Sequence, residues 1–180
     1  MSPETTMREP ASRLTKMALC VALCCIAAYI SIPLPFTTAV ITALTAIMCL
    51  TAFILPPKET FIVIFAWLLL GVVGLPVYVN GSSGFGRLFG PTGGFLWSFL
   101  VAYPLVSYIK GTKNDVTRFF VTGLISLPIT YIGGILSMMA LLDITLWQAL
   151  MLAVFPFIPG DIAKVLFASF VGTKLNKIVG

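Results

Sequence analysis

Apolar runs about as long as a lipid bilayer is thick follow one another along this chain of 180 residues, and they constrain its fold more than any other feature. A hydrocarbon core of about 30 Å needs about 20 helical residues to cross it. The runs are continuous rather than alternating, so they predict helices and not the strands of a membrane barrel. Because 59% of the residues are hydrophobic and only 9% are charged, the chain has too little polar surface for a soluble domain.

We therefore predict an all-α integral membrane protein, a bundle of six transmembrane helices. The predicted spans are residues 16–32, 37–55, 60–77, 93–109, 119–142 and 160–177. Prolines separate several spans, most clearly Pro56 and Pro57 between the second and the third. A short extra apolar helix, at the surface or re-entrant, is expected at 145–157 before the last span. Residues 1–15 are predicted to be a disordered cytoplasmic N-terminus, and 16–180 a single membrane domain.

The basic residues predict the orientation of the bundle. Most of them fall on one side of it, which the positive-inside rule makes cytoplasmic together with both termini. These residues are Arg8, Arg13, Lys16, Lys58, Lys110, Lys113, Arg118, Lys174 and Lys177. Arg87 lies in an outer loop, and Lys164 in the last span. The net charge of +5 follows from this topology, so we expect no nucleic-acid partner.

Catalytic and metal-binding residue types are scarce in the sequence. It has no histidine, and its four cysteines lie within predicted spans, so we expect no zinc site, no His-based catalytic dyad and no disulfide. It also has no glycine-rich phosphate motif followed by Lys and Ser or Thr, so ATP-driven work would need another chain. We expect neither an enzyme nor a bound cofactor or metal.

Asp161 and Lys164 form the most conspicuous ionisable pair. They follow Pro159 and Gly160 directly, in a stretch from residue 145 to 171 that has no other ionisable side chain. A charge at bilayer depth costs about 2.5–3.5 kcal/mol on insertion scales, so such residues usually serve a function. The proline and glycine break predicts a helix start beside a cavity on the outer face.

A glycine-rich stretch on the same outer face is the second candidate part of a site. Residues 80–95 read NGSSGFGRLFGPTGGF, and so many glycines let a backbone approach a ligand closely. Thr92 is a candidate N-cap of the fourth span, whose free N–H groups favour a carboxylate. We predict one pocket shared by this loop and the Asp161 helix start. Its further binding candidates are Asn80, Arg87, Gly93 and Gly94. The alternative is a flexible outer loop with an exposed charge.

Three motifs resemble one family. LFGPTGGF at 88–95 and FPFIPGDIAK at 155–164 look like BioY, and YISIPLPF at 29–36 resembles the end of that family's first helix and its first loop. The resemblance covers the whole chain in length and six-span layout. It implies the biotin-binding S component of an energy-coupling factor (ECF) transporter, in the cell inner (plasma) membrane of a bacterium. The implied partners are biotin, membrane lipid, a transmembrane coupling subunit and ATPase subunits.

The candidate polar residues suit biotin in two poses. Its ureido ring offers two N–H donors and a carbonyl acceptor, and its acyl tail ends in a carboxylate. Asp161 could accept from the ureido N–H groups while Lys164 or Asn80 donates to the carbonyl, or Lys164 could meet the tail carboxylate. Aromatic candidates for the apolar wall are Tyr29, Phe36, Tyr78, Phe85 and Trp97. The same aromatics could instead be anchors at the bilayer surface.

The first span carries small residues that let another helix approach closely, namely Ala18, Ala22 and Cys25. In the BioY family a comparable face contacts the coupling subunit. Ile26 interrupts the stripe, so packing within the bundle is an equal alternative to docking.

Three other functions stay open at this level. The chain could transport biotin alone, without a coupling module. It could be an intramembrane enzyme that uses Asp161 as acid or base, but Asp143 is expected in an outer turn and no second catalytic partner is evident. It could also be a structural membrane subunit in which Asp161 and Lys164 simply pair, since residues three apart on a helix are neighbours.

Overall fold

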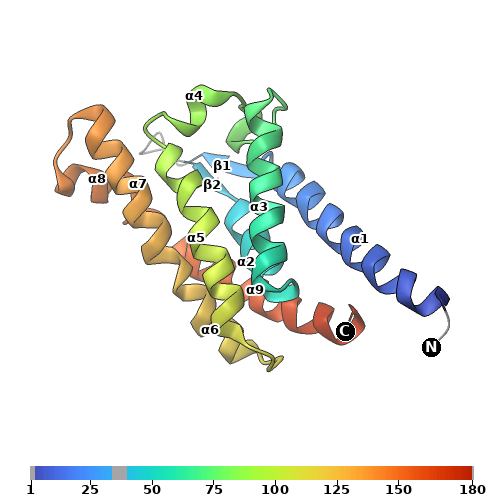
Figure 1. The fold of residues 1–180 in the computed structure, drawn as a ribbon. Coiled ribbons are helices and arrows are strands. Elements are labelled where there is room, and N and C mark those ends of the chain that lie inside the picture. The colour runs from blue at the N-terminus through green and yellow to red at the C-terminus, as the bar shows by residue number, and fades with distance from the viewer. Residues whose placement is uncertain (1–2, 34–39, 180) are drawn as a thin grey trace.

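The chain forms a bundle of helices around one core, with a short two-stranded ribbon near one end (Figure 1). This computed structural model describes residues 3–33 and 40–179. In chain order the elements are α1 (Pro3–Ala27), β1 (Ser31–Pro33), β2 (Val40–Thr42), α2 (Leu44–Ile54), α3 (Pro57–Val72), η1 (Val79–Gly81), α4 (Phe85–Leu88), α5 (Gly93–Lys110), α6 (Val116–Leu124), α7 (Ser126–Leu142), α8 (Leu146–Ala153) and α9 (Ile158–Val179). The fold is therefore helical, as the continuous apolar runs predict.

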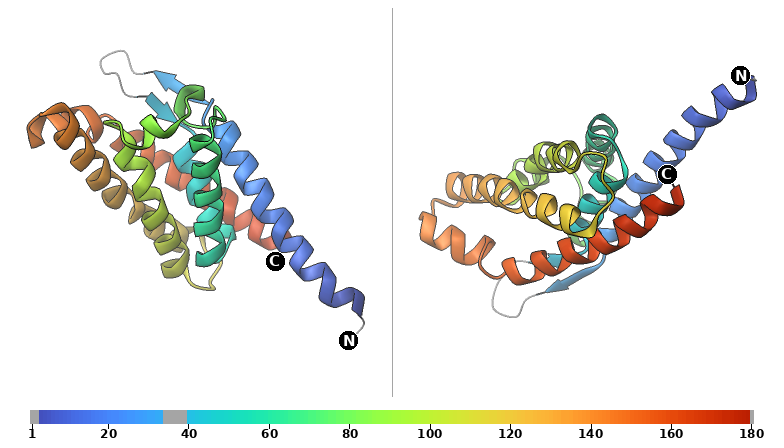
Figure 2. Two further views of the ribbon diagram at one scale, coloured as in Figure 1. Left: turned by 45° about the horizontal axis from the view of Figure 1, so that its top comes forward. Right: turned by 90° about the horizontal axis from the view of Figure 1, so that it is seen from below.

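α1 is the longest helix and projects beyond the rest of the bundle at its N-terminal end (Figure 2). It begins at Pro3, inside the segment 1–15 for which the sequence predicts disorder, so the helix is longer than expected. Arg13 ties this part to the bundle, because its guanidinium donates two hydrogen bonds to the Glu59 carboxylate at the start of α3, one of them 2.8 Å long.

The second predicted span begins later than expected. Val40–Thr42 is extended and pairs antiparallel with Ser31–Pro33. Ser31 lies opposite Thr42, and Pro33 lies opposite Val40. Three β-branched residues in a row favour such a strand over a helix. α2 therefore begins only at Leu44, and residues 37–39 of the predicted span lie outside the described part of the chain.

Prolines and one glycine set the boundaries of α2 and α3. α2 ends at Ile54 and α3 begins with Pro57, as the pair of prolines predicts. α3 ends at Val72, before the predicted end of the third span, because Gly74 just beyond it takes a left-handed φ of 102°. The chain then runs through η1 and α4 to reach α5.

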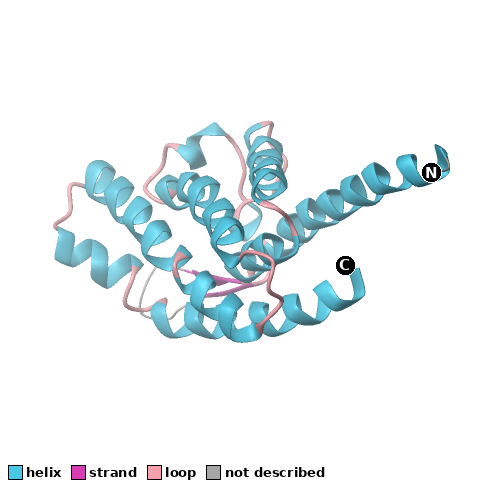
Figure 3. Cartoon of the chain, turned by 60° about the horizontal axis from the view of Figure 1, so that its bottom comes forward, coloured by secondary structure: helices cyan, strands magenta, loops and turns pink. Residues whose placement is uncertain are grey.

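The stretch Val116–Leu142 is long and apolar enough to cross a bilayer by length and composition. It is divided into α6 and α7 at Ile125, because Pro128 has no N–H to donate to the carbonyl of Leu124. The pair α8 and α9 meets the same criterion when the two helices are counted together, and it is bent by 49° (Figure 3).

α8 is the short apolar helix expected before the last span. Thr145 and Gln148 form a capping box at its start, in which each side chain accepts a hydrogen bond from the backbone N–H of the other residue. α8 ends at Ala153, and α9 begins at Ile158 with Pro159 in its first turn. The proline therefore marks a helix start, as predicted.

Large aromatic side chains from α2, α3, α6 and the loop before η1 pack in the core. Phe53 stacks on Phe119 with ring centres 4.6 Å apart, and Trp67 meets Tyr78 edge to face at 5.4 Å. All four are almost fully buried. Such dense packing fixes the helices relative to one another.

A set of hydrogen bonds joins the ends of α2, α5 and α9. Buried Lys110 donates from Nζ to the carbonyl oxygens of Phe53, at 2.6 Å, and Leu55, at 3.1 Å. Ser107 also donates to the Leu55 carbonyl, and Asn176 donates to the Phe53 carbonyl at 3.0 Å. These donors satisfy carbonyls that the end of α2 leaves free. The five residues are named the basal tie.

Candidate functional site

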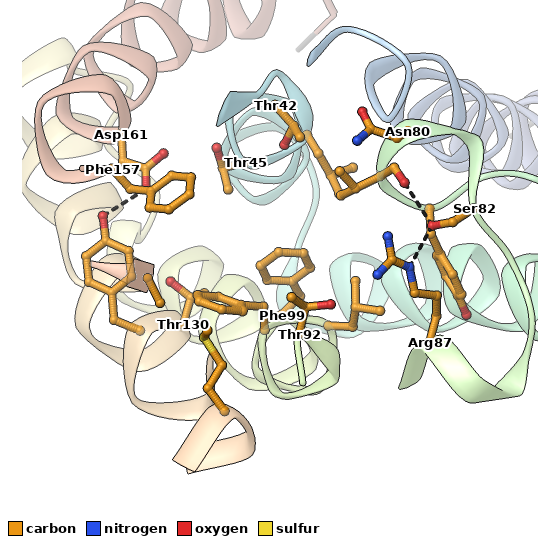
Figure 4. Close-up of a pocket in the computed structure, with 18 of the residues that line it drawn as sticks. Thr42, Thr45, Asn80, Ser82, Arg87, Thr92, Phe99, Thr130, Phe157 and Asp161 are labelled. Atoms are coloured by element: carbon orange, nitrogen blue, oxygen red, sulfur yellow. Dashed lines mark hydrogen bonds between the residues drawn. The ribbon is translucent and has the colours of Figure 1, made fainter. Parts of the chain in front are cut away.

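A cavity of about 260 Å³ lies where α2, α5 and α9 begin, at the end of the bundle opposite the basal tie (Figure 4). Its wall comes from those three helix starts, from the loop that contains η1 and α4, and from parts of α7 and α8. Small-molecule sites typically enclose about 300–1,000 Å³, so this cavity is slightly smaller than that range. The structure thus brings the glycine-rich loop and the start of the last helix together, as the sequence predicts.

Asp161 is the centre of a hydrogen-bonded cluster on one side of the cavity. Its side chain is buried, and Oδ1 accepts a hydrogen bond from Lys164 Nζ at 2.8 Å. Oδ2 accepts from the Tyr131 hydroxyl, also at 2.8 Å. Lys164 Nζ donates in addition to Thr45 Oγ1 at 3.3 Å. Donors on both oxygens offset the cost of burying the carboxylate and link α9 to α7 and α2.

Local sequence explains why these two charges meet. Asp161 lies in the first turn of α9, where the helix dipole favours a negative charge. Lys164 is three residues further along, which puts it on the same face of the helix. The Asp161 N–H donates to the Phe157 carbonyl at 2.8 Å and so continues the turn that precedes it.

Arg87 lies on the opposite side of the cavity, with its guanidinium directed inward from α4 (Figure 4). Its Nε donates to Ser82 Oγ at 3.0 Å. Within the described residues it forms no ion pair, because the two pairs found there join Arg13 with Glu59 and Lys164 with Asp161. Arg87 is therefore a cation without a protein counter-ion in that part of the chain.

Asn80 also lines the cavity, with Ser82 between it and Arg87 in Figure 4, and it forms a tight turn. Its backbone is left-handed, with φ of 58°, a conformation that asparagine adopts more readily than most residues. Its N–H donates to the Ala28 carbonyl at 3.1 Å, and its Oδ1 accepts from the Ser31 hydroxyl at 2.6 Å. The side-chain NH₂ group is thereby oriented as a donor for a ligand.

The charged side chains that line the cavity are Arg87, Asp161 and Lys164. One carboxylate and two cations leave a net charge of +1. Asp161 and Lys164 neutralise each other, so the excess positive charge belongs to Arg87. The starts of three helices at the cavity also favour negative charge there. The site can therefore hold a polar neutral group on one side and an anion on the other.

Tyr78 is the one described aromatic, among those predicted for the apolar wall, that lines the cavity. Its hydroxyl donates to the Leu68 carbonyl at 2.6 Å, and burial raises the pKa of the phenol above its ordinary value. The hydroxyl therefore stays neutral and its ring forms part of the wall. Apolar side chains that sequence reasoning missed complete the wall; they include Phe95, Leu96, Phe99, Met138 and Phe157.

The other predicted aromatics do not line the cavity. Tyr29 is 57% exposed, Phe85 is 64% exposed and Trp97 is 44% exposed. Exposed rings of this kind fit the alternative interpretation as anchors at a bilayer surface. Phe36 lies outside the described residues.

Thr92 lines the cavity, whereas Gly93 and Gly94 do not. The Thr92 side chain makes no capping hydrogen bond, and the Gly94 N–H donates to Ser137 Oγ at 3.2 Å. A Cβ atom on Gly94 would lie only 1.9 Å from the carbonyl oxygen of Gly133. In the structure this glycine therefore allows close contact between α5 and α7, and the N–H group expected for a ligand carboxylate is used within the protein.

Tyr131 is the cavity residue that sequence reasoning missed most clearly. It lies in α7 beside Thr130, and both line the cavity. The available signal was two adjacent hydroxyl-bearing residues inside an apolar span, because polar groups within a span need partners. Thr45 at the start of α2 carried the same kind of signal.

The three small residues predicted to form one face of α1 differ in their exposure. Ala18 and Ala22 are exposed, and Ile26 beside them is 59% exposed. Cys25 is half-buried and packs against the core. Two of the three stripe residues are therefore accessible to another helix, whereas Cys25 belongs to the packing within the bundle.

Comparisons with known proteins agree with this architecture. The family model described as the BioY family matches residues 1–180. The chain is 32% identical over 163 residues to the biotin transporter BioY2 of Lactococcus lactis subsp. cremoris, covering 90% of this chain and 88% of that one. It is 29% identical over 169 residues to the biotin transporter BioY of Thermotoga maritima, covering 92% and 96%.

A solved structure has the same fold. It is the crystal structure of the S-component for biotin from an ECF-type ABC transporter, which matches with a TM-score of 0.86 and 24% identity, covering 98% of this chain and 95% of that one. The resemblance carried by the three sequence motifs is thus confirmed, and the chain belongs to the BioY family.

Proposed function

We propose that the chain is the substrate-binding subunit of a biotin uptake transporter. It captures biotin at the outer face of the cell inner membrane for transport into the cytoplasm, and an ATP-driven coupling module supplies the energy. The observation that carries this function is the cavity, in which a neutral ion pair faces an arginine that has no counter-ion among the described residues. The family, whose relatives include biotin transporters, supports biotin as the ligand.

The charge distribution favours one of the two possible poses. Asp161 can accept from the ureido N–H groups, and Lys164 beside it can donate to the ureido carbonyl. The tail carboxylate then meets Arg87, which has no competing carboxylate in the described chain, and the Asn80 amide. The reverse pose would place the carboxylate near Asp161, where two negative groups would repel each other.

We propose six membrane crossings, made by α1, α2, α3, α5, α6 with α7, and α9, with both termini in the cytoplasm. Several basic residues support this topology, because they lie at helix ends on the side of the basal tie. Examples are Lys58, Lys110, Arg118 and Lys177. The cavity, at the other end of the bundle, then opens toward the outer face where biotin arrives.

The proposed partners are an ECF transmembrane coupling subunit and its ATPase subunits. The exposed face of α1 around Ala18 and Ala22 supports docking, because small residues let a second helix approach closely. The biotin S-component fold of the solved structure supports the same assembly.

Calorimetric titration of the detergent-purified chain tests the binding function. Biotin and a panel of other vitamins are titrated separately, with no other protein present. We expect tight binding of biotin alone. No heat of binding with biotin, from a monodisperse folded sample, would exclude the proposed function and return the chain to the structural-subunit alternative.

Two substitutions test whether the cavity is the binding site. Asp161→Asn and Lys164→Ala are each expected to lose biotin binding while the protein stays folded and monodisperse, because each removes one side of the polar cluster. Lys177→Ala, at the far end of the same helix, is the matched control and should bind normally. Normal binding by both cavity variants would show that the site lies elsewhere.

A further inference from the structure

Gly134 on α7 lies directly against the ring of Phe95 on α5. A Cβ atom placed on Gly134 would lie 2.0 Å from Cζ, 2.1 Å from Cε2 and 2.4 Å from Cε1 of that ring. Distances below about 3.0 Å do not occur between such atoms, so any side chain at position 134 must displace the ring. Phe95 itself lines the cavity.

The position of Gly134 on its helix explains why this contact matters for the cavity. Thr130 and Met138 both line the cavity from α7, and Gly134 lies midway between them on the same helical face, because residues four apart are neighbours. Gly134 thus leaves a gap in a row of cavity-lining side chains. The Phe95 ring lies at that gap and also lines the cavity.

The surroundings determine which atoms would move if the gap were filled. The backbones of α5 and α7 are held close to each other by Gly94 and Gly133, since a Cβ atom on Gly94 would meet the Gly133 carbonyl oxygen at 1.9 Å. In contrast, the atoms facing Gly134 are the far end of one side chain. The ring can move while the helices stay in place, and the space open to it is the cavity.

We propose that Gly134 is a size-determining residue of the binding site, because it recesses the Phe95 ring into α7 and so keeps the cavity wide enough for a fused two-ring ligand head. This inference rests on biotin as the ligand proposed above. A side chain at position 134 pushes the ring into the cavity and narrows the space for that head.

Gly134→Ala tests whether the space above this glycine holds the Phe95 ring out of the cavity. Adding Phe95→Leu to this variant tests whether a smaller side chain at position 95 restores binding. Leucine lacks the three ring atoms that would clash, Cζ, Cε1 and Cε2, so the double variant removes the conflict while it keeps an apolar side chain. We expect Gly134→Ala to lower biotin affinity at least about tenfold. The double variant should bind within about twofold of Phe95→Leu alone. Isothermal titration measures the biotin affinity of the unmodified chain, the two single variants and the double variant.

Two controls separate this effect from general loss of packing. Gly123→Ala also crowds an apolar neighbour, Val165, but Val165 does not line the cavity as Phe95 does, so biotin affinity should be unchanged in the folded variant. Phe99→Leu, another cavity aromatic, should not rescue Gly134→Ala. Dethiobiotin, which keeps the ureido ring and carboxylate but lacks the thioether ring, should lose less affinity than biotin because its head is narrower.

Each outcome decides the proposal. Unchanged affinity in Gly134→Ala, rescue by Phe99→Leu as complete as by Phe95→Leu, or equal losses for biotin and dethiobiotin would overturn it. If Gly134→Ala does not fold, the double variant must fold, and its failure would also overturn the proposal. If the unmodified chain does not bind biotin, the proposed function fails, while unfolding midpoints without ligand still test the recess: Phe95→Leu must restore the midpoint that Gly134→Ala lowers.

Discussion

Arg87 and Asp161 lie on opposite sides of one cavity. They differ in how many of their polar atoms form hydrogen bonds within the protein. Both carboxylate oxygens of Asp161 accept hydrogen bonds from protein donors, whereas Arg87 donates only to Ser82 among the described contacts. An arginine can hold a carboxylate by two parallel hydrogen bonds. The proposed orientation of biotin, with its tail carboxylate at Arg87, rests on this difference between the two residues.

Arg87→Gln should lower biotin affinity by roughly 10- to 100-fold, since a hydrogen bond to a charged group contributes about 1.5–3 kcal/mol. Calorimetric titration of the variant measures the loss. Biotin amide, in which the tail carboxylate is replaced by a neutral amide, is the matched ligand and should bind the variant and the unmodified chain alike. An equal loss for biotin amide would place the carboxylate away from Arg87.

Tyr131→Phe should destabilise the protein without ligand by about 1.5–3 kcal/mol, because the Oδ2 atom of buried Asp161 loses its donor. Chemical unfolding in detergent measures the change. Tyr108→Phe is the control, since Tyr108 is 74% exposed and its ring lies at the surface. Equal stabilities of the two variants would mean that the Tyr131 hydroxyl does not support the carboxylate.

The sequence points to some of these residues and not to others for a physical reason. Asp161 and Lys164 are conspicuous because charges are costly in an apolar tract. Phe95 is one of many apolar aromatics in the chain, and only the place of its ring beside α7 makes it part of the wall. Residue type thus reveals charged site residues, whereas apolar wall residues depend on tertiary structure.

Helix boundaries agree with the sequence prediction where a proline or a capping residue sets them. Pro57 starts α3, and the Thr145 capping box starts α8, as the sequence predicts. The ribbon of β1 and β2 was missed because its residues are apolar like those of a span, and apolarity alone does not separate a strand from a helix end. The contact between α5 and α7 could not be predicted, since each glycine in it fits a partner on the other helix.

Gly94→Ala should lower the unfolding free energy by about 1–3 kcal/mol, because its Cβ atom would meet backbone rather than a movable side chain and the two helices must separate. Thermal or chemical unfolding of the purified protein measures this loss. Gly86→Ala is the control, since a Cβ atom there has no neighbour within 4 Å. If both alanine variants are equally stable, the helices do not depend on this close contact.

α1 projects beyond the rest of the bundle (Figure 2). Ala18 and Ala22 on this helix are exposed. The sequence left docking and internal packing as equal alternatives, and it could not decide because a small residue suits both. The exposure of the two alanines favours docking, while Cys25 packs inward.

Ala22→Leu should abolish biotin uptake in cells that contain the coupling and ATPase subunits, because a large side chain keeps a second helix from approaching. Biotin binding by the purified variant should be unchanged. Ala140→Leu, at an exposed position on α7, is the matched control and should transport normally. Normal uptake by Ala22→Leu would show that the coupling subunit docks on another face, and uptake without ATP would exclude obligatory coupling.

The basal tie joins α2, α5 and α9 at the end of the bundle opposite the cavity. The three helices that begin around the cavity are held together by their far ends, where Lys110 and Asn176 bind the same carbonyl oxygen. Biotin bound in the cavity as proposed therefore lies at the end of the bundle away from these hydrogen bonds. With the proposed topology, biotin leaves such a cavity toward the outer face, so its delivery to the cytoplasm requires the protein itself to move.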